Sequence, residues 1–453
     1  MLKGFTRYLS NRLSRKKTVA PKQLILPRSE HPISRSEIHE GALKVLYRLH
    51  KQGHQAFLVG GCIRDRLLGK NPKDFDVATD ATPEEVNQLF RNSRIIGRRF
   101  KIVHVRFGRD LIEVTTFRGQ APQASSAQHK QSEEGMLLRD NVWGSIEEDA
   151  ARRDFTINAL YYNIADFALY DYTGGLEDLA NKQLRLIGDP ETRYREDPVR
   201  MLRALRFMAK LDFQLEEKTA APIKEHAELM LQVSPARLFD EVLKLFLSGQ
   251  AVTTFHLLRE YHLFEMLFPA TAEAFHTRPT ALPLVEQALA NTDRRIAEQR
   301  PVTPAFLYAA LLWPGLQQIW EDLQKRGTPP FPALQQAGNR LLQRQSQHIT
   351  LPKRFAFPMR EIWDLQLKLP KRHGKQAWRL LSEPRFRAAY DFLLLRETAG
   401  EATEGLAGWW TEFQETDEAG QQKMLADLGR SKAKTTSKRR RRPRNKKPTP
   451  QQE

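Results

Sequence analysis

One short segment constrains the fold more than any other, because it places two glycines and then two carboxylates beside short apolar runs. Ala56 to Val59 are apolar and predict a buried strand, which ends at Gly60 and Gly61. The residues that follow, to Leu68, predict one or two helical turns. A strand that stops at glycines before a helix brings backbone N–H groups close to a bound anion. The segment therefore predicts an anion-binding turn.

The polar side chains after this turn indicate what the anion is. Arg64 has a planar guanidinium that suits phosphate. Asp74 and Asp76 follow, and if they lie on a strand they share one face while Phe75 and Val77 point to the core. Two carboxylates on one face repel each other unless a cation lies between them, and Mg²⁺ bound by carboxylates and substrate phosphates is the usual solution. The pattern predicts phosphoryl or nucleotidyl transfer.

Each feature has a simpler explanation when it is taken alone, since Gly-Gly is commonly a turn and Asp-x-Asp commonly lies on the surface. Their order and spacing favour the joint interpretation. Gly-Gly-x-x-Arg-Asp followed by Asp-x-Asp also resembles the head of class II nucleotidyltransferases of the polymerase-beta superfamily, which includes bacterial poly(A) polymerases and CCA-adding tRNA nucleotidyltransferases. Cys62 stands where many relatives have a third small residue, and its small size preserves the resemblance.

Composition limits the classes of protein that fit. A chain of 453 residues predicts two or more domains, and 40% hydrophobic with 28% charged residues is typical of a globular protein. The single cysteine excludes an internal disulfide and argues against a cysteine-based zinc site. No apolar run approaches the ~20 residues of a transmembrane helix. The net charge of +18 indicates a polyanionic partner, with nucleic acid ahead of an anionic membrane surface.

The first 33 residues form a basic N-terminal arm, in which the first acidic residue is Glu30. Phe5, Leu9 and Leu13 recur at helical spacing among lysines and arginines, so one interpretation is an amphipathic helix on a membrane surface. An organellar transit peptide and a disordered arm are the alternatives. The arm lacks the apolar centre of a secretory signal.

Capping residues predict two helices around the glycine and carboxylate segment. Ser34 followed by Glu37 forms a capping box for a helix that runs to Lys51. Thr82, before a proline and two glutamates, predicts the start of another helix that runs to Phe90.

A hairpin is predicted next. Val103–Phe107 and Leu111–Phe117 alternate in character around a Gly-Arg-Asp turn. Glu113 lies on the second strand, where it either completes a carboxylate cluster with the two aspartates or is an ordinary solvated residue. The polar segment from Gln120 to Gly135 predicts a mobile loop.

Residues 152–154, Arg-Arg-Asp, form a second cluster of charged residues beside an apolar run. From the residues alone, ribose and phosphate contacts compete with a surface ion-pair cluster. The sequence resembles the Arg-Arg-Asp motif of the same family, which implies that Arg153 and Asp154 lie by the nucleotide sugar and the catalytic cluster. The third catalytic carboxylate stays open among Glu113, Asp149 and Asp154, and we favour Asp154 because it belongs to the motif.

A further charged cluster begins the second half of the chain. Asp197 is a good N-cap and Pro198 fits the first turn of a helix that runs to Ala209. Asp197, Arg200 and Arg203 then lie on roughly one face, either as an exposed charge ladder or as a site that binds the edge of a base. The segment resembles Glu-Asp-x-x-Arg, the nucleotide-selecting motif of class II enzymes, which implies that these side chains choose the incoming base.

The pattern from residue 211 to residue 428 is helical almost throughout. Core packing is favoured over base stacking for four tryptophans, Trp363, Trp378, Trp409 and Trp410. Two basic stretches, Lys353 with Arg354 and the segment 374–379, have two interpretations: they line a path for RNA, or they form a solvated basic face. From Ser431 onward ten lysines and arginines face one acid, Glu453, which predicts a disordered tail that binds RNA.

We therefore expect an α+β fold: a polymerase-beta-like nucleotidyltransferase head with a small mixed sheet, followed by all-α neck and body domains. The predicted divisions are the arm at 1–33, the catalytic head at 34–185, the nucleotide-selecting neck at 186–250, the RNA-binding body at 251–430 and the tail at 431–453. A monomer in the cytoplasm is expected.

The resemblance covers residues 34–250 in several ordered motifs and implies template-independent addition of AMP from ATP to RNA 3′ ends, in RNA decay and mRNA processing. Asp74 and Asp76 would hold two Mg²⁺ ions, and Gly60, Gly61 and Arg64 the triphosphate.

The alternatives are CCA addition to tRNA and a non-catalytic RNA-binding protein. Ile95–Val105 resembles the signature of bacterial poly(A) polymerases, and the basic tail suits binding to single-stranded RNA of any sequence. Both observations favour polyadenylation. Expected partners are RNA 3′ ends, RNA-decay proteins and, weakly through the arm, a membrane surface.

Overall fold

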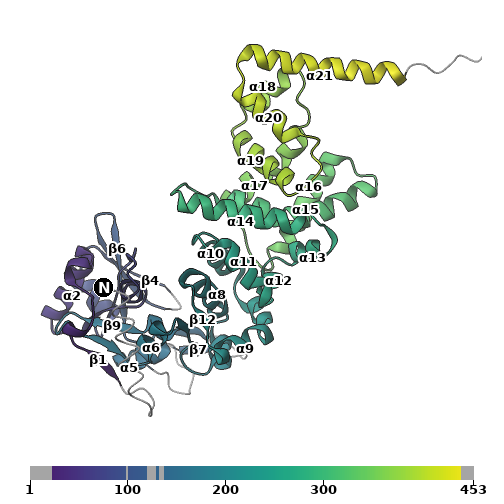
Figure 1. Ribbon diagram of the computed structural model, residues 1–453. Coiled ribbons are helices and arrows are strands. Elements are labelled where there is room, and N and C mark those ends of the chain that lie inside the picture. The colour runs from purple at the N-terminus through teal and green to yellow at the C-terminus, as the bar shows by residue number, and fades with distance from the viewer. Residues whose placement is uncertain (1–22, 98–99, 120–128, 132–136, 440–453) are drawn as a thin grey trace, which may run out of the picture. The chain divides into compact units, whose positions relative to one another are not determined.

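The computed structural model of the protein describes residues 23–97, 100–119, 129–131 and 137–439 (Figure 1). The chain divides into two compact units, Met1–Val233 with Thr253–Met266, and Ser234–Val252 with Leu267–Glu453. The predicted interpretations of the arm up to residue 22 and of the tail after residue 439 lie outside the described residues. Within the described ranges, no helix is both long enough and apolar enough to cross a membrane.

A mixed eight-stranded sheet is the framework of the first unit, in the order β1-β10-β9-β2-β3-β6-β5-β4 among the described residues. β3 and β6 are parallel, and every other neighbouring pair in it is antiparallel. The strands are β1 Leu24–Leu26, β2 Ala56–Val59, β3 Asp76–Thr79, β4 Ser93–Ile96, β5 Ile102–Phe107, β6 Asp110–Thr116, β9 Leu160–Asn163 and β10 Leu169–Asp171. The α+β class with a mixed sheet is confirmed.

The local predictions around the sheet hold with one shift. β2 is buried along its whole length and ends at Gly60, and β5 and β6 form the predicted hairpin, with Gly108 at a φ of 61° in its turn. The strand predicted from Asp74 is wrong at its start, because β3 begins at Asp76. Asp74 lies on the exposed approach to the strand.

Helices pack on both faces of the sheet (Figure 1). On one face, α2 (Glu40–Lys51) contacts β2, β3 and β6, and α4 (Pro83–Leu89) contacts β4, β5 and β6. On the other, α5 (Ile146–Arg152) packs its Ile146 and Ala150 in a cluster with the aromatic rings of the central strands. The further short helices of this region are α3 Gly61–Leu67, α6 Gly175–Ala180, η1 Arg28–Glu30, η2 Arg35–Glu37 and η3 Thr156–Asn158.

The predicted capping boxes are present, but one of them caps a different element. Thr82 and Glu85 cap α4 as expected. Ser34 and Glu37 instead enclose the single 3₁₀ turn η2, and α2 begins after His39, whose Nδ1 accepts the Gly41 N–H at 3.1 Å. The N-cap predicted at Ser34 is therefore wrong by five residues.

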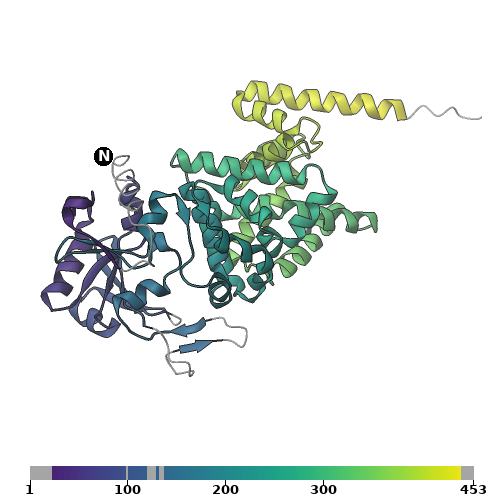
Figure 2. The same cartoon turned by 60° about the horizontal axis from the view of Figure 1, so that its bottom comes forward.

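The segment predicted as a loop from Gln120 to Gly135 contains a strand. β7 (His129–Gln131) pairs antiparallel with β8 (Leu137–Asp140), in a two-stranded ribbon that Figure 2 shows clearly. Residues 120–128 and 132–136 lie outside the described part, so the prediction of mobility stays untested there. The three residues of β7 are polar and show no alternation with apolar residues, so the sequence pattern does not predict a strand. The strand is defined by its pairing with β8.

The rest of the first unit is mainly helical. A two-stranded parallel ladder joins residues 183–184 to residues 214–215. The elements are β11 Gln183–Leu184, α7 Pro190–Glu196, α8 Val199–Leu211, β12 Gln214–Leu215, α9 Glu217–Glu225, η4 Ala227–Gln232, α11 Ala251–Glu260 and α12 Leu263–Leu267. The N-cap predicted at Asp197 is displaced by one residue, because Pro198 occupies the cap position of α8 and Asp197 ends α7.

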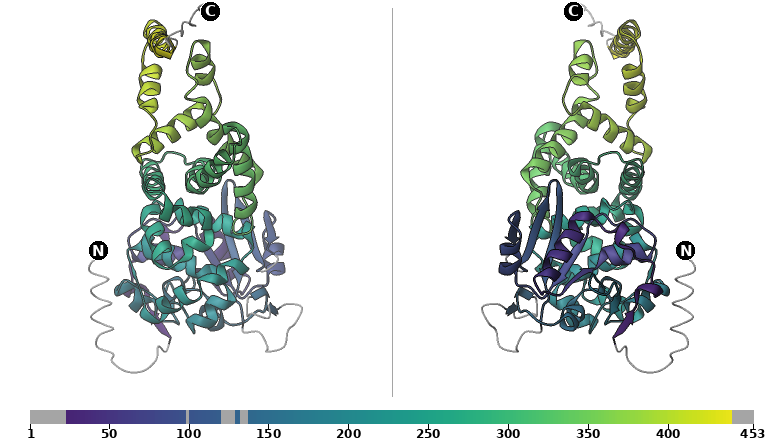
Figure 3. Two further views of the ribbon diagram at one scale, coloured as in Figure 1. Left: turned by 90° about the vertical axis from the view of Figure 1, so that its right-hand side faces the viewer. Right: turned by 90° about the vertical axis from the view of Figure 1, so that its left-hand side faces the viewer.

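The second unit contains only helices in its described residues, and α15 to α21 are the green to yellow helices of Figure 3. They are α10 Pro235–Phe246, α13 Pro269–Thr277, α14 Ala281–Ala297, α15 Pro304–Lys325, α16 Pro330–Gln345, α17 Lys353–Lys368, α18 Lys375–Leu381, α19 Phe386–Thr398, α20 Leu406–Glu415 and α21 Glu418–Arg439. Trp363 and Trp410 are buried, and Trp378 and Trp409 pack against the same cluster as Trp410, so the packing interpretation is confirmed.

The C-terminal basic segment is helical further than predicted. Disorder was expected from Ser431, whereas α21 continues to Arg439. Lysine, arginine and alanine are good helix formers, so like charge alone does not end a helix. Pro443 lies only four residues beyond the last helical residue.

We expect Asp171 to be a main stabilising residue of the first unit. Its buried carboxylate accepts the backbone N–H groups of four residues, Thr173, Gly174, Gly175 and Leu176, at 2.8–3.0 Å. Asp171→Ala leaves these donors without their acceptor, and should lower the free energy of unfolding by about 2–4 kcal/mol. Thermal and urea unfolding measure it, with exposed Glu225→Ala as the control; equal midpoints for the two variants would contradict the assignment.

Candidate active site

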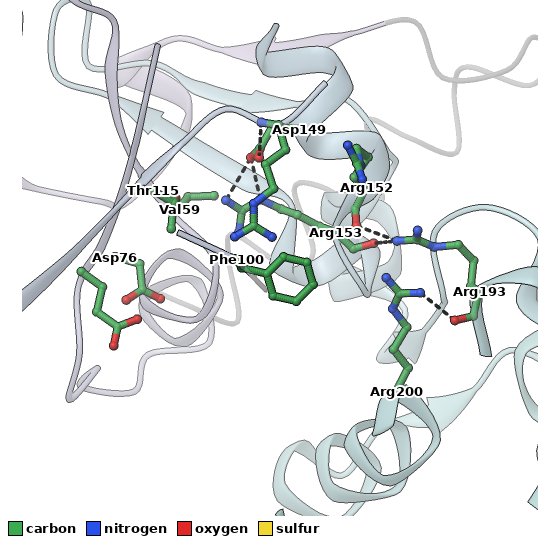
Figure 4. Close-up of a pocket in the computed structure, with 11 residues that line it drawn as sticks. Val59, Asp76, Phe100, Thr115, Asp149, Arg152, Arg153, Arg193 and Arg200 are labelled. Carbon is green, nitrogen blue, oxygen red and sulfur yellow. Dashed lines mark hydrogen bonds and ion pairs between the residues drawn. The ribbon is translucent and has the colours of Figure 1, made fainter. Parts of the chain in front are cut away.

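A pocket of the first unit brings together part of the predicted site (Figure 4). Carboxylates lie at one end, and guanidinium groups at the centre and the other end. The lining residues are Val59, Asp76, Phe100, Glu113, Thr115, Arg118, Asp149, Arg152, Arg153, Arg193 and Arg200. Of the predicted residues, Asp76, Arg153 and Arg200 are among them.

The carboxylates of the pocket meet because β3 and β6 are parallel neighbours. Asp76 is paired in register with Glu113, so both side chains stand on the same face of the sheet. On the other side of Glu113, the Nε2 of His104 lies 3.3 Å from its Oε1. The glycine turn closes this end, since a Cβ at Gly60 would lie only 4.0 Å from Asp76 Oδ2 and 3.8 Å from Arg153 Nη1. The turn, with a Gly60 φ of 79°, therefore approaches both charged groups.

The electrostatics of this end fit a hard cation. Burial, and then the charges of Glu113 and Asp74, raise the pKa of Asp76 to about 6, while Arg153 acts in the opposite direction. Oxygen ligands with uncompensated negative charge are what Mg²⁺ prefers, and substrate phosphates commonly complete its shell. In the described residues no three histidine, cysteine, aspartate or glutamate side chains are grouped to hold an ion by themselves. The fit is thus that of a carboxylate pair, with Asp74 nearby.

Arg153 is held in place by a buried hydrogen-bond network with Asp149 (Figure 4) and Tyr161. Its guanidinium donates to Asp149 Oδ2 at 3.0 and 3.1 Å and to the Tyr161 hydroxyl at 2.8 Å. Tyr161 in turn donates to the same Asp149 oxygen at 2.7 Å, and the other oxygen accepts the Arg118 N–H at 3.1 Å. Asp149, one of the three carboxylates left open, is therefore an anchor for Arg153. Its oxygens are engaged by three donors and do not face Asp76.

The carboxylate of Asp154, which was favoured as the third catalytic carboxylate, is already engaged in an ion pair. It forms an ion pair with Arg203 of α8 and also accepts from the Asn158 amide and the Phe155 N–H. Burial raises the pKa of Asp154, but Arg203 and these hydrogen bonds outweigh it and lower the pKa to about 2. Asp154 and Arg203 are outside the lining of the pocket. The structure brings Glu113 to Asp76 instead.

Arg64, predicted to hold the triphosphate, lies behind the glycine turn. It is 4% exposed, and donates to Asp65 at 2.7–2.8 Å and to the Asn158 amide oxygen at 2.6 Å. A Cβ at Gly61 would lie 3.4 Å from its Nη2. Arg64 therefore supports the turn and shares Asn158 with Asp154, and it does not line the pocket.

The nucleotide-selecting segment contributes one of its three predicted residues to the lining of the pocket. Arg200 is buried, lines the pocket, and donates to the Arg193 carbonyl at 2.6 Å and to Glu196 at 2.9 Å. Arg193 itself donates to the backbone carbonyls of Arg152 and Arg153 at 2.6 and 2.8 Å. Asp197 is half-buried and outside the lining.

Sequence reasoning missed the residues that act through others. Tyr161 and Arg193 have no signal of their own, since they act on residues of other elements. Glu196 is the first residue of the Glu-Asp-x-x-Arg segment, but no role was predicted for it. Glu113 did have one, because it stands on a hairpin strand at alternate spacing from buried residues; only the pairing of β6 with β3 was unknown.

Three family models match the chain, and together they span most of it. Residues 56–185 match the poly A polymerase head domain, residues 212–275 the probable RNA and SrmB-binding site of polymerase A, and residues 326–446 the polymerase A arginine-rich C-terminus. Poly(A) polymerase I of Salmonella typhi is 49% identical over 435 residues, which are 94% of this chain and 93% of that protein. The chain belongs to the bacterial poly(A) polymerase I family.

Matches to CCA-adding enzymes are less extensive. The CCA-adding enzyme of Lactobacillus helveticus is 38% identical over 224 residues, 49% of this chain and 54% of that protein. Among solved structures, the Bacillus stearothermophilus CCA-adding enzyme in complex with CTP is similar with a TM-score of 0.53 and 26% identity, over 85% of this chain and 82% of that one. The poly(A) polymerase family thus shares its head fold with CCA-adding enzymes, as predicted.

The raised pKa of Asp76 predicts a pH dependence of stability. A carboxyl whose pKa rises from 3.8 to about 6 on folding binds protons more tightly in the folded state, so stability falls as pH rises through that interval. Asp76→Asn removes this loss. In metal-free buffer the variant should therefore be more stable than wild type at pH ~8, by at most about 3 kcal/mol, and equally stable near pH ~4.

Thermal unfolding with a chelator, scanned from pH ~4 to ~8, tests this. Asp74→Asn is the matched control, since Asp74 is exposed and its removal should give a smaller gain. Parallel stability curves for wild type and Asp76→Asn at every pH would refute the prediction.

Proposed function

We propose that this protein adds AMP from ATP to the 3′ hydroxyl of RNA without a template and releases pyrophosphate, as a polynucleotide adenylyltransferase in RNA decay and mRNA processing. The observation that carries the proposal is the 49% identity to poly(A) polymerase I over almost the whole of both chains. The pocket supports it, because a carboxylate pair and five arginines line it and the glycine turn approaches it.

In this proposal each end of the pocket binds a different part of ATP. The Gly60–Gly61 turn approaches the triphosphate, and Arg153 contacts the phosphates or sugar from its fixed position over Asp149. Arg200 binds the edge of the base with Asp197 nearby. Arg64 positions the turn, and Asp154 positions Arg203 on α8. The 3′ oxygen then forms a bond to the α-phosphorus, the bond to the pyrophosphate oxygen breaks, and the hydroxyl proton is released.

Two Mg²⁺ ions are the implied cofactor, and Asp74, Asp76 and Glu113 are the residues that would hold them. Bound there, the ions would supply Lewis-acid activation of the hydroxyl and charge neutralisation of the triphosphate. The chain's own contribution is to keep Asp76 and Glu113 on one face of the sheet, where their mutual repulsion favours a bound cation.

The partners follow from the same proposal. Single-stranded RNA 3′ ends, with little sequence preference, are the substrate, and the basic body and tail bind their phosphates. We further propose a monomer that acts in the cytoplasm, contacts RNA-decay proteins, and associates weakly with membrane surfaces through residues 1–33. The proposal includes the division of the chain into head, neck, body and tail, with boundaries at residues 185, 250 and 430.

Nucleotide choice separates this function from CCA addition. A labelled RNA that ends in a 3′ hydroxyl is incubated with each nucleoside triphosphate separately and with all four. Long homopolymer growth with ATP alone is expected. A stop after addition of C, C and A would establish CCA addition instead, and no addition by a folded protein would leave only an RNA-binding role.

The carboxylate assignment gives a second test. Glu113→Gln should lower nucleotide addition by at least ~100-fold without lowering the unfolding midpoint, because the side chain is half-exposed and its loss relieves repulsion with Asp76. Asp154→Asn should instead cost about 1–3 kcal/mol of stability, because it leaves Arg203 without its ion pair. Activity and thermal unfolding are measured on both variants. A fully active Glu113→Gln enzyme would remove Glu113 from the site.

A further inference from the structure

The second unit contains a long segment without acidic residues. Between Asp322 and Glu361 the sequence has seven lysines and arginines and no aspartate or glutamate, although the whole chain has 54 acidic residues among 453. The segment comprises α16 and the first half of α17, which are neighbouring helices (Figure 1). So strong a bias of charge indicates a polyanionic partner for these two helices.

Two phenylalanine rings of this segment face solvent. Phe331 is 48% and Phe357 is 62% exposed, and no other phenylalanine of the described residues is classed as exposed. Single exposed apolar side chains are common on protein surfaces. Here, however, both rings lie in the segment that lacks acids. Exposed rings among cations suit single-stranded nucleic acid, because bases stack on the rings while the cations bind phosphates.

A polar row runs along the contact between the two helices. Arg360 of α17 donates to the side-chain oxygen of Asn339 at 2.8 Å and to that of Gln335 at 3.0 Å. Gln335 in turn donates to Asp364 at 2.5 Å. Residue numbers therefore rise along α17 as they fall along α16, so the two helices are antiparallel at this row.

The two exposed rings lie at opposite ends of the polar row. Phe331 comes one turn before Gln335 on α16, and Phe357 comes about one turn before Arg360 on α17, so each ring shares a face with the row. Because the helices are antiparallel, these two turns extend in opposite directions. The result is an elongated surface with a ring at each end and amide and guanidinium groups between them.

Positive charge adjoins the Phe357 end of this surface. Lys353 and Arg354 are exposed in the first turn of α17, about one turn before Phe357. Cations are unfavourable at the N-terminal end of a helix, so this pair does not stabilise α17. The first acid beyond the segment, Glu361, is already paired with Arg385 at 3.1 Å. The charge of the lysine and arginine is therefore available to an external anion.

We propose that α16 and α17 form a stacking surface for single-stranded RNA. Bases pack on Phe331 and Phe357, and the phosphates between them contact Lys353 and Arg354. Stacking accepts every base, which fits a substrate with little sequence preference. The surface lies outside residues 212–275, the segment that matches the probable RNA-binding model.

The choice of RNA as the ligand rests on the proposed function. In that function the reacting 3′ end occupies the pocket of the first unit, so the bases on this surface belong to the RNA chain behind that end. The surface would then contribute to affinity for the RNA and not to choice of the incoming nucleotide.

Affinity for two ligands of equal length tests the stacking. One is labelled oligoadenylate, the other a ribose-phosphate chain without bases, and binding is followed by fluorescence anisotropy without ATP. Phe331→Ala and Phe357→Ala should each weaken oligoadenylate about fivefold or more and leave the base-free chain unchanged. Phe357→Trp keeps a ring and should stay within about threefold of wild type. Ile25→Ala, which truncates an exposed apolar side chain of β1, is the control and should change neither affinity.

The cations should behave differently from the rings. Replacement of both Lys353 and Arg354 by glutamine should weaken the two ligands alike, and should make the dependence of log affinity on log salt shallower by about 1.4. Lys44→Gln is the matched control, because Lys44 is exposed and paired with Glu40 of its own helix. Its affinities and its salt dependence should equal those of wild type.

Two results would overturn the proposal. Equal weakening of oligoadenylate and the base-free chain by the alanine variants would mean that the rings only shape a phosphate site. Unchanged affinity for both ligands would assign the exposed rings to a protein partner instead. Unfolding midpoints, measured for every variant, should equal that of wild type because these side chains are exposed.

The failure of this inference can be told apart from the failure of the proposed function. Binding is measured without nucleotide addition, so a protein that loses oligoadenylate affinity in the ring variants but adds no nucleotide would contradict the function alone. A protein that adds long adenylate tails and binds both ligands equally well with and without the rings would contradict the stacking surface alone.

Discussion

The parallel pairing of β3 with β6 is the constraint on which the site depends. It joins two segments that are about 37 residues apart and sets Asp76 directly beside Glu113 on one sheet face. Burial of the Asp76 carboxylate, and then its repulsion by Glu113, oppose folding of the free protein, and both raise the pKa of Asp76. The large apolar clusters on either side of the sheet stabilise the unit enough to hold the pair together. The geometry of the carboxylate pair therefore depends on β3 and β6, which are held in place by packing outside the pocket.

A second level of organisation lies behind the pocket. Arg64, Asn158, Asp154 and Arg203 form one continuous hydrogen-bonded chain from the glycine turn to α8. Several residues that the motifs single out therefore support the residues that face the substrate. The charges of Arg64, Asp154 and Arg203 must be kept together, because loss of one side chain would leave a buried charge without its partner.

Much of the head could be predicted from the sequence, because its signals are local. The buried strand before Gly60, the hairpin around Gly108 and the capping box at Thr82 each depend on a few adjacent residues, and each was right. The surroundings of Asp154 and Glu113 could not be predicted in this way, because they depend on residues far away in the sequence. Arg203, which occupies Asp154, is 49 residues away, and the partner of β6 is set by the sheet order. Likewise the strand β7 is defined by its pairing with β8, and a charge pattern alone did not reveal that α21 continues to Arg439.

Arg193 has a consequence for the cost of binding. Its single guanidinium bonds the carbonyls of Arg152 and Arg153, while its own carbonyl accepts from Arg200. The end of α5 and the start of α8 are thus joined through Arg193 of α7, by its own side chain at α5 and by the Arg200 side chain at its carbonyl, although they are over 40 residues apart in sequence. A ligand that bridges them does not have to restrict two independent segments, so little conformational entropy is lost when it binds. The rigidity was acquired once, when the chain folded, and serves every subsequent cycle.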